Sequence, residues 1–178
     1  MPGAPDALLQ YLSTFDFDRD APKIFATDST FGESAMAFMA PPDVDDPKLA
    51  ALRGHGGKLL VYHGSSDPVF SVNATTRWFA KLQANGGRDF ARLYTVPGMT
   101  HCGGGPATDR FDPLEALVAW VERGEAPRAL VATVNPANPD LPANWSRTRT
   151  RPLCPFPQVP RYSGGDTESA ASFRCIDP

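Results

Sequence analysis

The sequence predicts an α/β fold built on a mostly parallel, doubly wound sheet. Two short apolar segments, residues 58–63 and 90–96, have the length and composition of strands, and a segment with helical periodicity separates them. A second helical segment follows, and its beginning at Asp112 carries the usual helix-start residues. Strands that alternate with helices in this order are typical of sheets covered by helices on both faces.

The composition is that of one globular core with a nearly balanced charge. The chain has 178 residues, of which 42% are hydrophobic, and this is enough for a single core. The formal net charge of −3 excludes no partner outright, but it does not favour nucleic acid or a membrane surface. No apolar run approaches the roughly 20 residues of a membrane span. Residues 1–6 hold neither a basic nor a hydrophobic segment, so we expect no signal peptide.

The N-terminal quarter shows little regular pattern. Residues 6–18 predict a short amphipathic helix that ends in an aromatic, acidic stretch. Residues 19–47 have no sustained period, and the proline-rich and aspartate-rich part at 40–47 predicts a loop. Residues 48–53 then predict a short helix that ends at Gly54.

The first strand is the clearest element. Residues 58–63 form a continuous apolar run between glycines, which suits a strand buried on both faces in a parallel sheet. Residues 65–68 form a polar turn after it. Ser71 is a plausible N-cap for a helix that runs to about Asn85. The expected apolar face of this helix holds Val72, Thr76, Phe79 and Leu82.

The second strand, residues 90–96, leads into a loop with four glycines around His101 and Cys102. Glycine lets the backbone adopt positive φ, and such a loop can present an imidazole as a general base at the end of a strand. The alternative is a flexible surface loop with an incidental histidine. The next helix is expected to begin at Asp112 as N-cap and to end at Gly124. Its expected apolar stripe holds Leu114, Leu117, Val118 and Val121.

The rest of the chain is proline-rich. Residues 129–134 predict a short strand, and residues from 135 onward are expected to be loop. Cys154 and Cys175 lie 21 positions apart in this tail, where a disulfide would stabilise a segment with little core by about 3 kcal/mol. Cys102 would then lack a partner. The alternative is a reduced protein with three free thiols.

Asp67 and His101 follow the two predicted strands directly. Functional groups of open α/β sheets lie beyond the carboxyl ends of the strands, and 34 residues separate these two. An acid followed by a histidine is the second part of the α/β-hydrolase triad, whose chain order is Ser, Asp or Glu, His. The acid accepts the imidazole Nδ1–H, and the other nitrogen takes the proton of a serine hydroxyl. The alternative for Asp67 is a residue of an Asp-Pro turn.

No nucleophile is evident in the chain. Ser65 and Ser66 stand beside the candidate acid, and no Gly-x-Ser-x-Gly segment occurs in the sequence. His63 is expected to pack at the strand end or to line the site, and His55 to be exposed. A metal site made of the three histidines and Cys102 is not favoured, because no spacing among them matches a zinc pattern.

Several stretches together resemble one known family. They are Lys58–Gly64 with Asp67 and Pro68, Phe90–Leu93, Pro97–Met99, His101–Pro106, Leu114–Val118, Trp120–Gly124, Ala126 with Pro127, and Thr150–Pro155 with Tyr162 and Cys175. Phe15–Asp18 adds a weaker match. The family is that of the tannases and feruloyl esterases, secreted serine esterases of the α/β-hydrolase fold that include mono(2-hydroxyethyl) terephthalate hydrolases.

The resemblance implies roles for five residues. Asp67 and His101 would be two members of the triad. Cys102 would form a disulfide with the cysteine just before the nucleophilic serine, a partner outside this chain. Cys154 and Cys175 would form the separate carboxyl-terminal disulfide of the family.

The sequence departs from the family because the Gly-Cys-Ser-x-Gly-Gly segment is absent. The first strands, the oxyanion hole and most of the lid, where the family carries a calcium ion, are absent too. We therefore expect an incomplete, carboxyl-terminal portion of an α/β hydrolase. Residues 1–47 would be a remnant of the lid or linker, residues 48–134 the second half of the core, and residues 135–178 a disulfide-bonded tail. No cofactor is expected in this chain.

The resemblance also implies a function. The complete enzyme would hydrolyse small aromatic esters such as gallates or ferulates and would be secreted or periplasmic. This chain would need the missing N-terminal part of the enzyme as its partner and would be inactive alone. It would bind neither nucleic acid nor membranes. A non-catalytic binding or regulatory module on a hydrolase scaffold is the alternative, and a hydrolase that uses Ser66 as its nucleophile is a third possibility.

Overall fold

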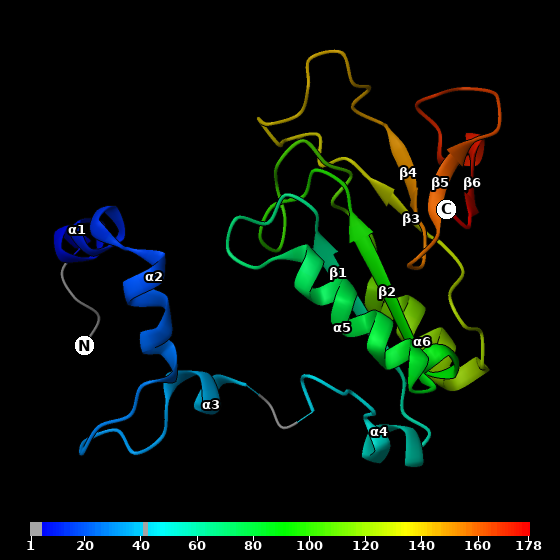
Figure 1. Ribbon diagram of the computed structural model, residues 1–178. Helices are drawn as coiled ribbons and strands as arrows, with labels where there is room; N and C mark the ends of the chain where they lie inside the picture. Colours follow the sequence, from blue (N-terminus) through cyan, green and yellow to red (C-terminus); the bar gives the residue numbers. More distant parts are fainter. Residues whose placement is uncertain (1–4, 41–42) are drawn as a thin grey trace. The chain divides into compact units, whose positions relative to one another are not determined.

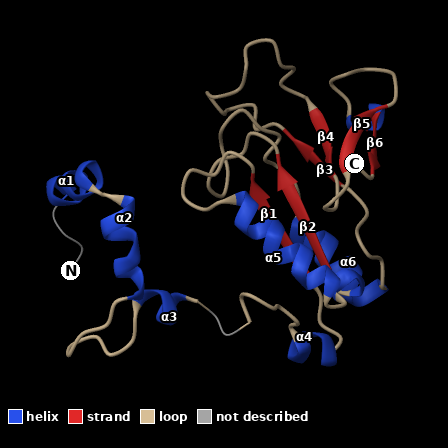
Figure 2. Cartoon of the chain, viewed as in Figure 1, coloured by secondary structure: helices blue, strands red, loops and turns tan. Residues whose placement is uncertain are grey.

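A computed structural model describes residues 5–40 and 43–178 of the chain (Figure 1). The chain divides into two compact units, Met1–Val44 and Asp45–Pro178. Figure 2 shows that the first unit contains helices and loops, whereas the second also contains all the strands of the described residues.

The first unit is a series of short helices. They are α1 (Pro5–Thr14), α2 (Phe17–Asp20), η1 (Ala21–Phe25) and α3 (Ala35–Met39). The short helix expected at the start of residues 6–18 is α1. The aromatic, acidic stretch after it begins α2, which the Asp16 side chain caps by accepting the N–H of Arg19 at 2.9 Å. The hydrogen bonds of Arg19 and Lys23 hold the pKa of the buried Asp20 well below its usual range.

The second unit is organised around one parallel strand pair. Its first elements are α4 (Ala50–Gly54), β1 (Leu59–Gly64), α5 (Val72–Ala84), η2 (Gly87–Asp89) and β2 (Ala91–Val96). β1 and β2 pair in parallel from Leu59 opposite Ala91 to Gly64 opposite Val96. Both predicted strands and the helix between them are confirmed, and they form one β-α-β unit.

β2 is buried on both faces. On one face, Leu93 packs in a cluster with Phe79 and Leu82 of α5. On the other face, Tyr94 and Val96 belong to a second cluster, which the C-terminal segments complete with Leu130, Ala132 and Leu153. The alternation of side chains along a strand places these two clusters on opposite sides. β2 is therefore the centre of this unit.

β1 is less buried than its apolar sequence predicts. Tyr62 is 44% exposed, and most other residues of β1 are only half-buried. In the described part of the chain, β1 pairs with β2 alone, so its other edge carries no strand. The expected burial on both faces would need further elements beside β1.

Helix α6 (Pro113–Arg123) confirms its predicted ends. Asp112 Oδ1 accepts the N–H of Glu115 at 2.8 Å, and Gly124 closes the helix with a φ of 72°. Ser71 occupies the predicted N-cap position of α5, but its side chain makes no capping hydrogen bond there.

The apolar stripe predicted for α6 is mostly on the surface. Leu114, Val118 and Val121 are exposed, whereas Ala119 and Trp120 are buried. The helix is amphipathic, as expected, but the described residues cover only the side that carries Trp120. The sequence pattern of α6 therefore anticipates a packing partner that the rest of the second unit does not provide.

The tail contains more structure than its proline content predicts. It forms β3 (Leu130–Thr133), β4 (Thr150–Leu153), β5 (Val159–Tyr162), η3 (Ala170–Ser172) and β6 (Phe173–Ile176). The expectation of loop from residue 135 onward is thus wrong for the last three strands. β3 pairs antiparallel with β4, and β5 with β6. The disulfide between Cys154 and Cys175 joins the end of β4 to β6.

The sheet is smaller than a doubly wound sheet. The described residues form three sheets of two strands each, of which only β1–β2 is parallel. α5 packs on one face of this pair, and Ala116 of α6 packs against the cluster on the other face. Helices thus lie on both sides of the parallel pair. Among the described residues, no helix has the length and apolar character needed to cross a membrane.

Candidate active site

Asp67 and His101 meet at the carboxyl end of the parallel strand pair. Asp67 Oδ2 lies 2.8 Å from His101 Nδ1. The register explains this contact, because Gly64 and Val96, the last residues of β1 and β2, lie opposite each other. The two following loops therefore leave the sheet at the same level.

Backbone hydrogen bonds hold these two loops together. The N–H of Ser65 donates to the carbonyl of Val96 at 3.0 Å, and the N–H of Ser66 donates to the carbonyl of Met99 at 3.0 Å. In the opposite direction, the N–H of Gly98 donates to Ser65 Oγ at 3.1 Å. The position of Asp67 relative to His101 is therefore set by main-chain contacts as well as by their own hydrogen bond.

Gly64 allows the loops to approach this closely. A Cβ at this position would lie 2.3 Å from the carbonyl oxygen of Met99 and 2.5 Å from that of Thr100. Backbone atoms cannot move away as a flexible side chain could. A residue larger than glycine would therefore push the histidine loop away from the end of β1.

The histidine loop has a defined shape. Gly98 and Gly105 have φ values of 76° and 71°, and Cys102, between them, has a left-handed φ of 63°. The N–H of Gly104 donates to Asp109 Oδ2 at 2.9 Å. Asn138 Nδ2 donates to the carbonyl of Gly105 at 2.8 Å. The sequence alone does not identify these two contacts, since nothing in the spacing of Asp109 or Asn138 marks them.

The carboxylate of Asp67 has hydrogen-bond donors on both oxygens. Oδ1 accepts the N–H groups of Val69 at 2.7 Å and Phe70 at 3.0 Å, while Oδ2 faces His101. The side chain is only 5% exposed. Burial by itself raises the pKa of Asp67, but the hydrogen bonds from His101, Phe70 and Val69 outweigh it and lower the pKa to about 2. Asp67 is therefore ionised at neutral pH.

His101 has one nitrogen free for chemistry. Because Nδ1 faces a carboxylate, which only accepts, Nδ1 carries the proton and Nε2 carries the lone pair. The side chain is 44% exposed, and its ring lies 5.3 Å from that of Phe70. An imidazole oriented in this way can accept a proton from a hydroxyl group within hydrogen-bond distance of Nε2.

A cavity of about 420 Å³ opens beside this pair. His101, Cys102, Phe70 and Tyr62 line it together with His63, so one wall is aromatic. This volume is within the range of small-molecule sites. The sequence does not single out Phe70, which follows the Asp-Pro turn without any pattern of its own.

His63 lines the same cavity and is nearly buried beside Asp67. Its side chain is 11% exposed, and its Nε2 is 3.4 Å from Asp67 Oδ2. The same nitrogen lies 3.2 Å from the carbonyl of Phe70, and Nδ1 lies 2.8 Å from Thr75 Oγ1. His55, by contrast, is exposed near the end of α4, away from these contacts.

The structure shows one unpaired thiol next to the site. Cys102 is exposed and free, whereas Cys154 and Cys175 are bonded to each other. Neither Ser65 nor Ser66 has a hydrogen bond with His101 within the described residues, and Ser65 Oγ already accepts the N–H of Gly98. No serine of the described chain is thus positioned as the nucleophile of this pair.

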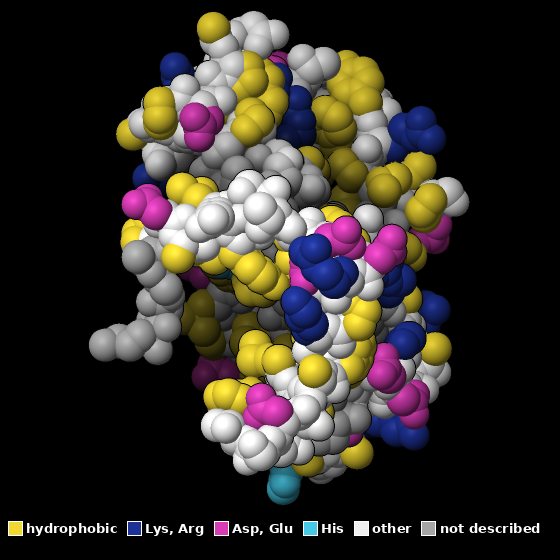
Figure 3. Space-filling view, turned by 60° about the vertical axis from the view of Figure 1, so that its left-hand side comes forward, with side chains coloured by type: hydrophobic (Ala, Val, Ile, Leu, Met, Phe, Trp, Pro, Cys, Tyr) yellow, Lys and Arg dark blue, Asp and Glu magenta, His cyan; other side chains and the backbone are white. Residues whose placement is uncertain are grey.

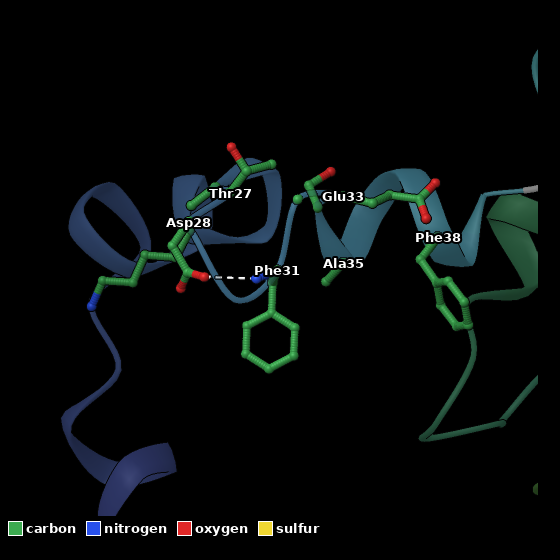
Figure 4. Close-up of a pocket in the computed structure, with 10 residues that line it drawn as sticks. Thr27, Asp28, Phe31, Glu33, Ala35 and Phe38 are labelled. Atoms are coloured by element: carbon green, nitrogen blue, oxygen red, sulfur yellow. Dashed lines mark hydrogen bonds between the residues drawn. The ribbon is translucent and has the colours of Figure 1, made fainter.

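The first unit contains a separate cavity of about 670 Å³ (Figure 4). Phe31 and Phe38 project to the same side of this segment, and the Asp28 carboxylate is occupied by the N–H groups of Thr30 and Phe31 at 2.7 Å. The lining contains no histidine or cysteine. This cavity therefore contains no acid–imidazole pair like that of Asp67 and His101.

Metal ligands do not gather at either cavity. Within residues 5–40 and 43–178, no three side chains of the His, Cys, Asp and Glu types are close enough together to hold one metal ion. The arrangement around His101 is that of an acid–imidazole pair, which prepares a general base.

Comparison with known proteins yields one family. The family model described as "Tannase and feruloyl esterase" matches residues 11–176. The chain is 47% identical over 175 residues to the mono(2-hydroxyethyl) terephthalate hydrolase of Piscinibacter sakaiensis, covering 92% of this chain and 26% of that protein. It is 36% identical over 171 residues to a probable feruloyl esterase of Arthroderma benhamiae, with 92% and 30% covered. The chain thus spans less than a third of these relatives.

Two solved structures that are similar to this chain are also esterases. The chain is similar to an esterase from Aspergillus oryzae with a TM-score of 0.61 and 25% identity, covering 72% of this chain and 29% of that one. A feruloyl esterase B from the same organism matches with a TM-score of 0.57 and 24% identity, covering 72% and 28%. The fold of the chain is therefore consistent with part of an α/β hydrolase.

Proposed function

Because the chain belongs to the tannase and feruloyl esterase family, we propose that it is the carboxyl-terminal part of a carboxylic ester hydrolase. It contributes Asp67 and His101 to a Ser-His-Asp triad. The observation that carries the proposal is the 2.8 Å contact between Asp67 Oδ2 and His101 Nδ1 at the ends of two neighbouring parallel strands.

The mechanism is acyl transfer with a serine supplied from outside this chain. As the serine oxygen attacks the ester carbonyl, its proton passes to His101 Nε2. Asp67 holds the Nδ1–H and stabilises the imidazolium that forms. His101 then gives the proton to the leaving alcohol. A water molecule, activated by the same imidazole, attacks the acyl-serine and releases the acid.

Unpartnered apolar surface supports the view that this chain is one portion of a larger enzyme. The stripe of Leu114, Val118 and Val121 on α6 is exposed, as are Phe17 and Phe38 of the first unit. Figure 3 shows hydrophobic side chains at the surface between charged ones. Exposed apolar area of this kind marks interaction surfaces. The missing N-terminal part of the enzyme is the partner that we propose for it.

Cys102 fits the same proposal. It is unpaired, exposed and adjacent to His101. We expect it to form a disulfide with a cysteine just before the nucleophilic serine, so that the bond joins two catalytic loops. The disulfide already present between Cys154 and Cys175 is consistent with an oxidising location, secreted or periplasmic.

The substrate class that we propose is a small aromatic carboxylic ester. The aromatic wall formed by Phe70 and Tyr62 beside His101 suits a planar ring. The names of the relatives, a terephthalate monoester hydrolase and a feruloyl esterase, belong to enzymes that act on such esters.

The test is a chimera that restores the missing portion. This chain replaces the matching carboxyl-terminal segment of the Piscinibacter sakaiensis hydrolase, with which it shares 47% identity. We expect hydrolysis of mono(2-hydroxyethyl) terephthalate by the chimera. His101→Ala and Asp67→Asn should reduce kcat by about 10⁴-fold or more, as triad substitutions do. His55→Gln is the matched control, because His55 is the exposed histidine outside the site.

Two outcomes would contradict the proposal. One is a chimera that folds, as judged by a cooperative melt, and does not hydrolyse the ester. The other is an active chimera in which the His101→Ala variant keeps its activity. A non-catalytic module on a hydrolase scaffold predicts the first of these.

A further inference from the structure

We propose that His63 is a positioning residue for the triad, with its Nε2–H acting as a second donor to the carboxylate of Asp67. The inference rests on the proposed function, because it assigns a role relative to Asp67 and His101. Nitrogens of two imidazoles lie near the same oxygen, Asp67 Oδ2. His101 Nδ1 lies at 2.8 Å and His63 Nε2 at 3.4 Å.

The partners of His63 determine which nitrogen carries its proton. Nε2 faces the carboxylate of Asp67 and the carbonyl of Phe70, and both groups only accept hydrogen bonds. Nε2 must therefore donate. In the neutral ring Nδ1 then accepts, and the Thr75 hydroxyl at 2.8 Å can donate to it. His63 and His101 thus carry their protons on opposite nitrogens.

These contacts prevent His63 from acting as the base itself. Its side chain is 11% exposed, and both ring nitrogens already have partners. His101 Nε2, in contrast, has no partner among the described residues. His63 therefore works through Asp67, while His101 has the lone pair that a serine hydroxyl needs.

The position of His63 lets it fix the carboxylate. It is the penultimate residue of β1, its Nδ1 reaches Thr75 on α5, and its Nε2 reaches the loop after β1. The N–H groups of Val69 and Phe70 donate to Oδ1, and His101 Nδ1 donates to Oδ2. The Nε2–H of His63, which lies 3.4 Å from Oδ2 and also faces the carbonyl of Phe70, would complete a set of four. Such a set fills the usual acceptor sites of a carboxylate and opposes rotation of its plane. Oδ2 then stays directed at His101 Nδ1.

The first test is the tautomer of each histidine in this chain. The chain has three histidines, so ¹⁵N-histidine labelling gives three rings, and single His→Gln variants assign them. At neutral or higher pH we expect the Nε2–H tautomer for His63 and the Nδ1–H tautomer for His101. A Nδ1–H tautomer at His63 would overturn the proposal, whatever the activity of the enzyme.

The second test separates a donor from a packing group, and it uses the chimera described above. Gln places its N–H group near the position of histidine Nε2, whereas Asn cannot reach it and Phe only fills the space. We expect His63→Gln to keep kcat within about threefold, whereas His63→Asn and His63→Phe lower kcat by about tenfold or more without a change in KM. Thermal melts of all variants show whether each is folded.

The results distinguish this inference from the proposed function. If His63→Phe keeps the kcat of the parent, His63 only packs and the inference is wrong, even when His101→Ala is inactive. If His101→Ala remains active, the proposed function fails instead. His55→Gln, the variant of a histidine outside the site, should leave kcat and KM unchanged in both cases.

Discussion

Asp67 is the residue at which most hydrogen bonds of the site converge. It accepts two backbone N–H groups on one oxygen and faces two imidazoles with the other. Its side chain is nearly inaccessible, yet these donors more than offset the effect of burial on its pKa. The sequence predicts Asp67 and its partner His101, but not the backbone donors to the other oxygen. Neither Val69 nor Phe70 carries a signal beyond its place in an Asp-Pro turn.

The first prediction concerns the titration of Asp67. Its pKa of about 2 lies below the value of about 3.9 for an unfolded aspartate, so the folded state binds the proton less readily. The stability that this carboxylate contributes is fully present above about pH 4 and is lost as the pH falls toward 2. ¹³C NMR of the Asp Cγ resonances measures the titration of Asp67, and the spectrum of the Asp67→Asn variant assigns its resonance. A titration midpoint of Asp67 near 4 would contradict the hydrogen-bond set.

The second prediction concerns Gly64, where the site depends on a missing Cβ. Gly64→Ala places a methyl group 2.3 Å from the Met99 carbonyl oxygen, so β1 and the histidine loop must separate. We expect a loss of about 1–3 kcal/mol in the free energy of unfolding, in the range of other overpacking substitutions. Denaturant unfolding followed by circular dichroism provides the measurement.

Gly54→Ala is the matched control for Gly64→Ala. Gly54 lies in the last turn of α4, and no atom would lie within 4 Å of a Cβ at that position. Alanine also favours helix, so the control should be neutral or slightly stabilising. Equal losses in the two variants would show that the approach of the Met99 carbonyl is not what requires glycine at position 64.

At the scale of elements, local signals predict the β-α-β unit well. Glycines bound both strands, and Asp112 and Gly124 mark the ends of α6 by chemistry that does not depend on the rest of the fold. Parallel pairing then places the ends of β1 and β2 together, so the proximity of Asp67 and His101 follows from local elements. This is why the geometry of the candidate site could be anticipated without a structure.

The strands of the tail could not be anticipated in the same way. β4 and β5 are four residues long, and each contains a proline, Pro152 and Pro160. Short proline-containing segments give no period, and they become strands only because β3 and β6 provide partners. The apolar stripe of α6 fails for a related reason. Its sequence shows that a face is apolar, but not whether this chain covers that face.

The third prediction concerns the ion pair that attaches the tail. Arg149 Nε donates to Glu168 Oε2 at 2.7 Å, and the same oxygen accepts the N–H of Ser146 at 3.0 Å. The hydrogen bond of Arg149 lowers the pKa of Glu168 to about 2. Glu168→Gln should weaken both contacts and lower the free energy of unfolding by about 1–2 kcal/mol at neutral pH. Faster amide exchange at Ser146 should accompany the loss.

An exposed pair of the same chemistry serves as the control for Glu168. Arg123 and Glu125 form an ion pair with both side chains more than half exposed, so Glu125→Gln should change stability by less than about 0.5 kcal/mol. The effect of Glu168→Gln should also vanish as the pH falls toward 2. The lowered pKa of Glu168 means that its carboxylate stabilises the fold above this pH and loses that contribution when it is protonated. A pH-independent difference between wild type and Glu168→Gln would argue against the ion pair as its source.

At the scale of the whole molecule, the described residues hold an acid–imidazole pair, and none of their serine hydroxyl groups is hydrogen-bonded to His101. His101 Nε2 is free and faces a cavity, while the two serines nearest to Asp67 are engaged in loop contacts or lie apart from the imidazole. The same chain exposes apolar faces on α6 and in the first unit. The proposal that this chain is the carboxyl-terminal part of an esterase explains both features, since the N-terminal part would supply the serine and cover these faces.

The fourth prediction follows from this proposal and concerns the chain without the N-terminal part of the enzyme. Without a serine hydroxyl within reach of His101 Nε2, we expect no hydrolysis of p-nitrophenyl acetate above the buffer rate and no labelling by a fluorophosphonate probe.

The exposed apolar faces of the chain should bind a hydrophobic dye such as ANS and favour aggregation. Helix α6 and strand β1 should exchange amide protons faster than β2, which is buried on both faces. Hydrolysis that disappears in His101→Ala would show instead that this chain contains its own nucleophile, and labelling lost in Ser66→Ala would identify it. A soluble monomer with a sharp cooperative melt and no dye binding would contradict the expectation of exposed apolar faces, because these faces would then need no partner.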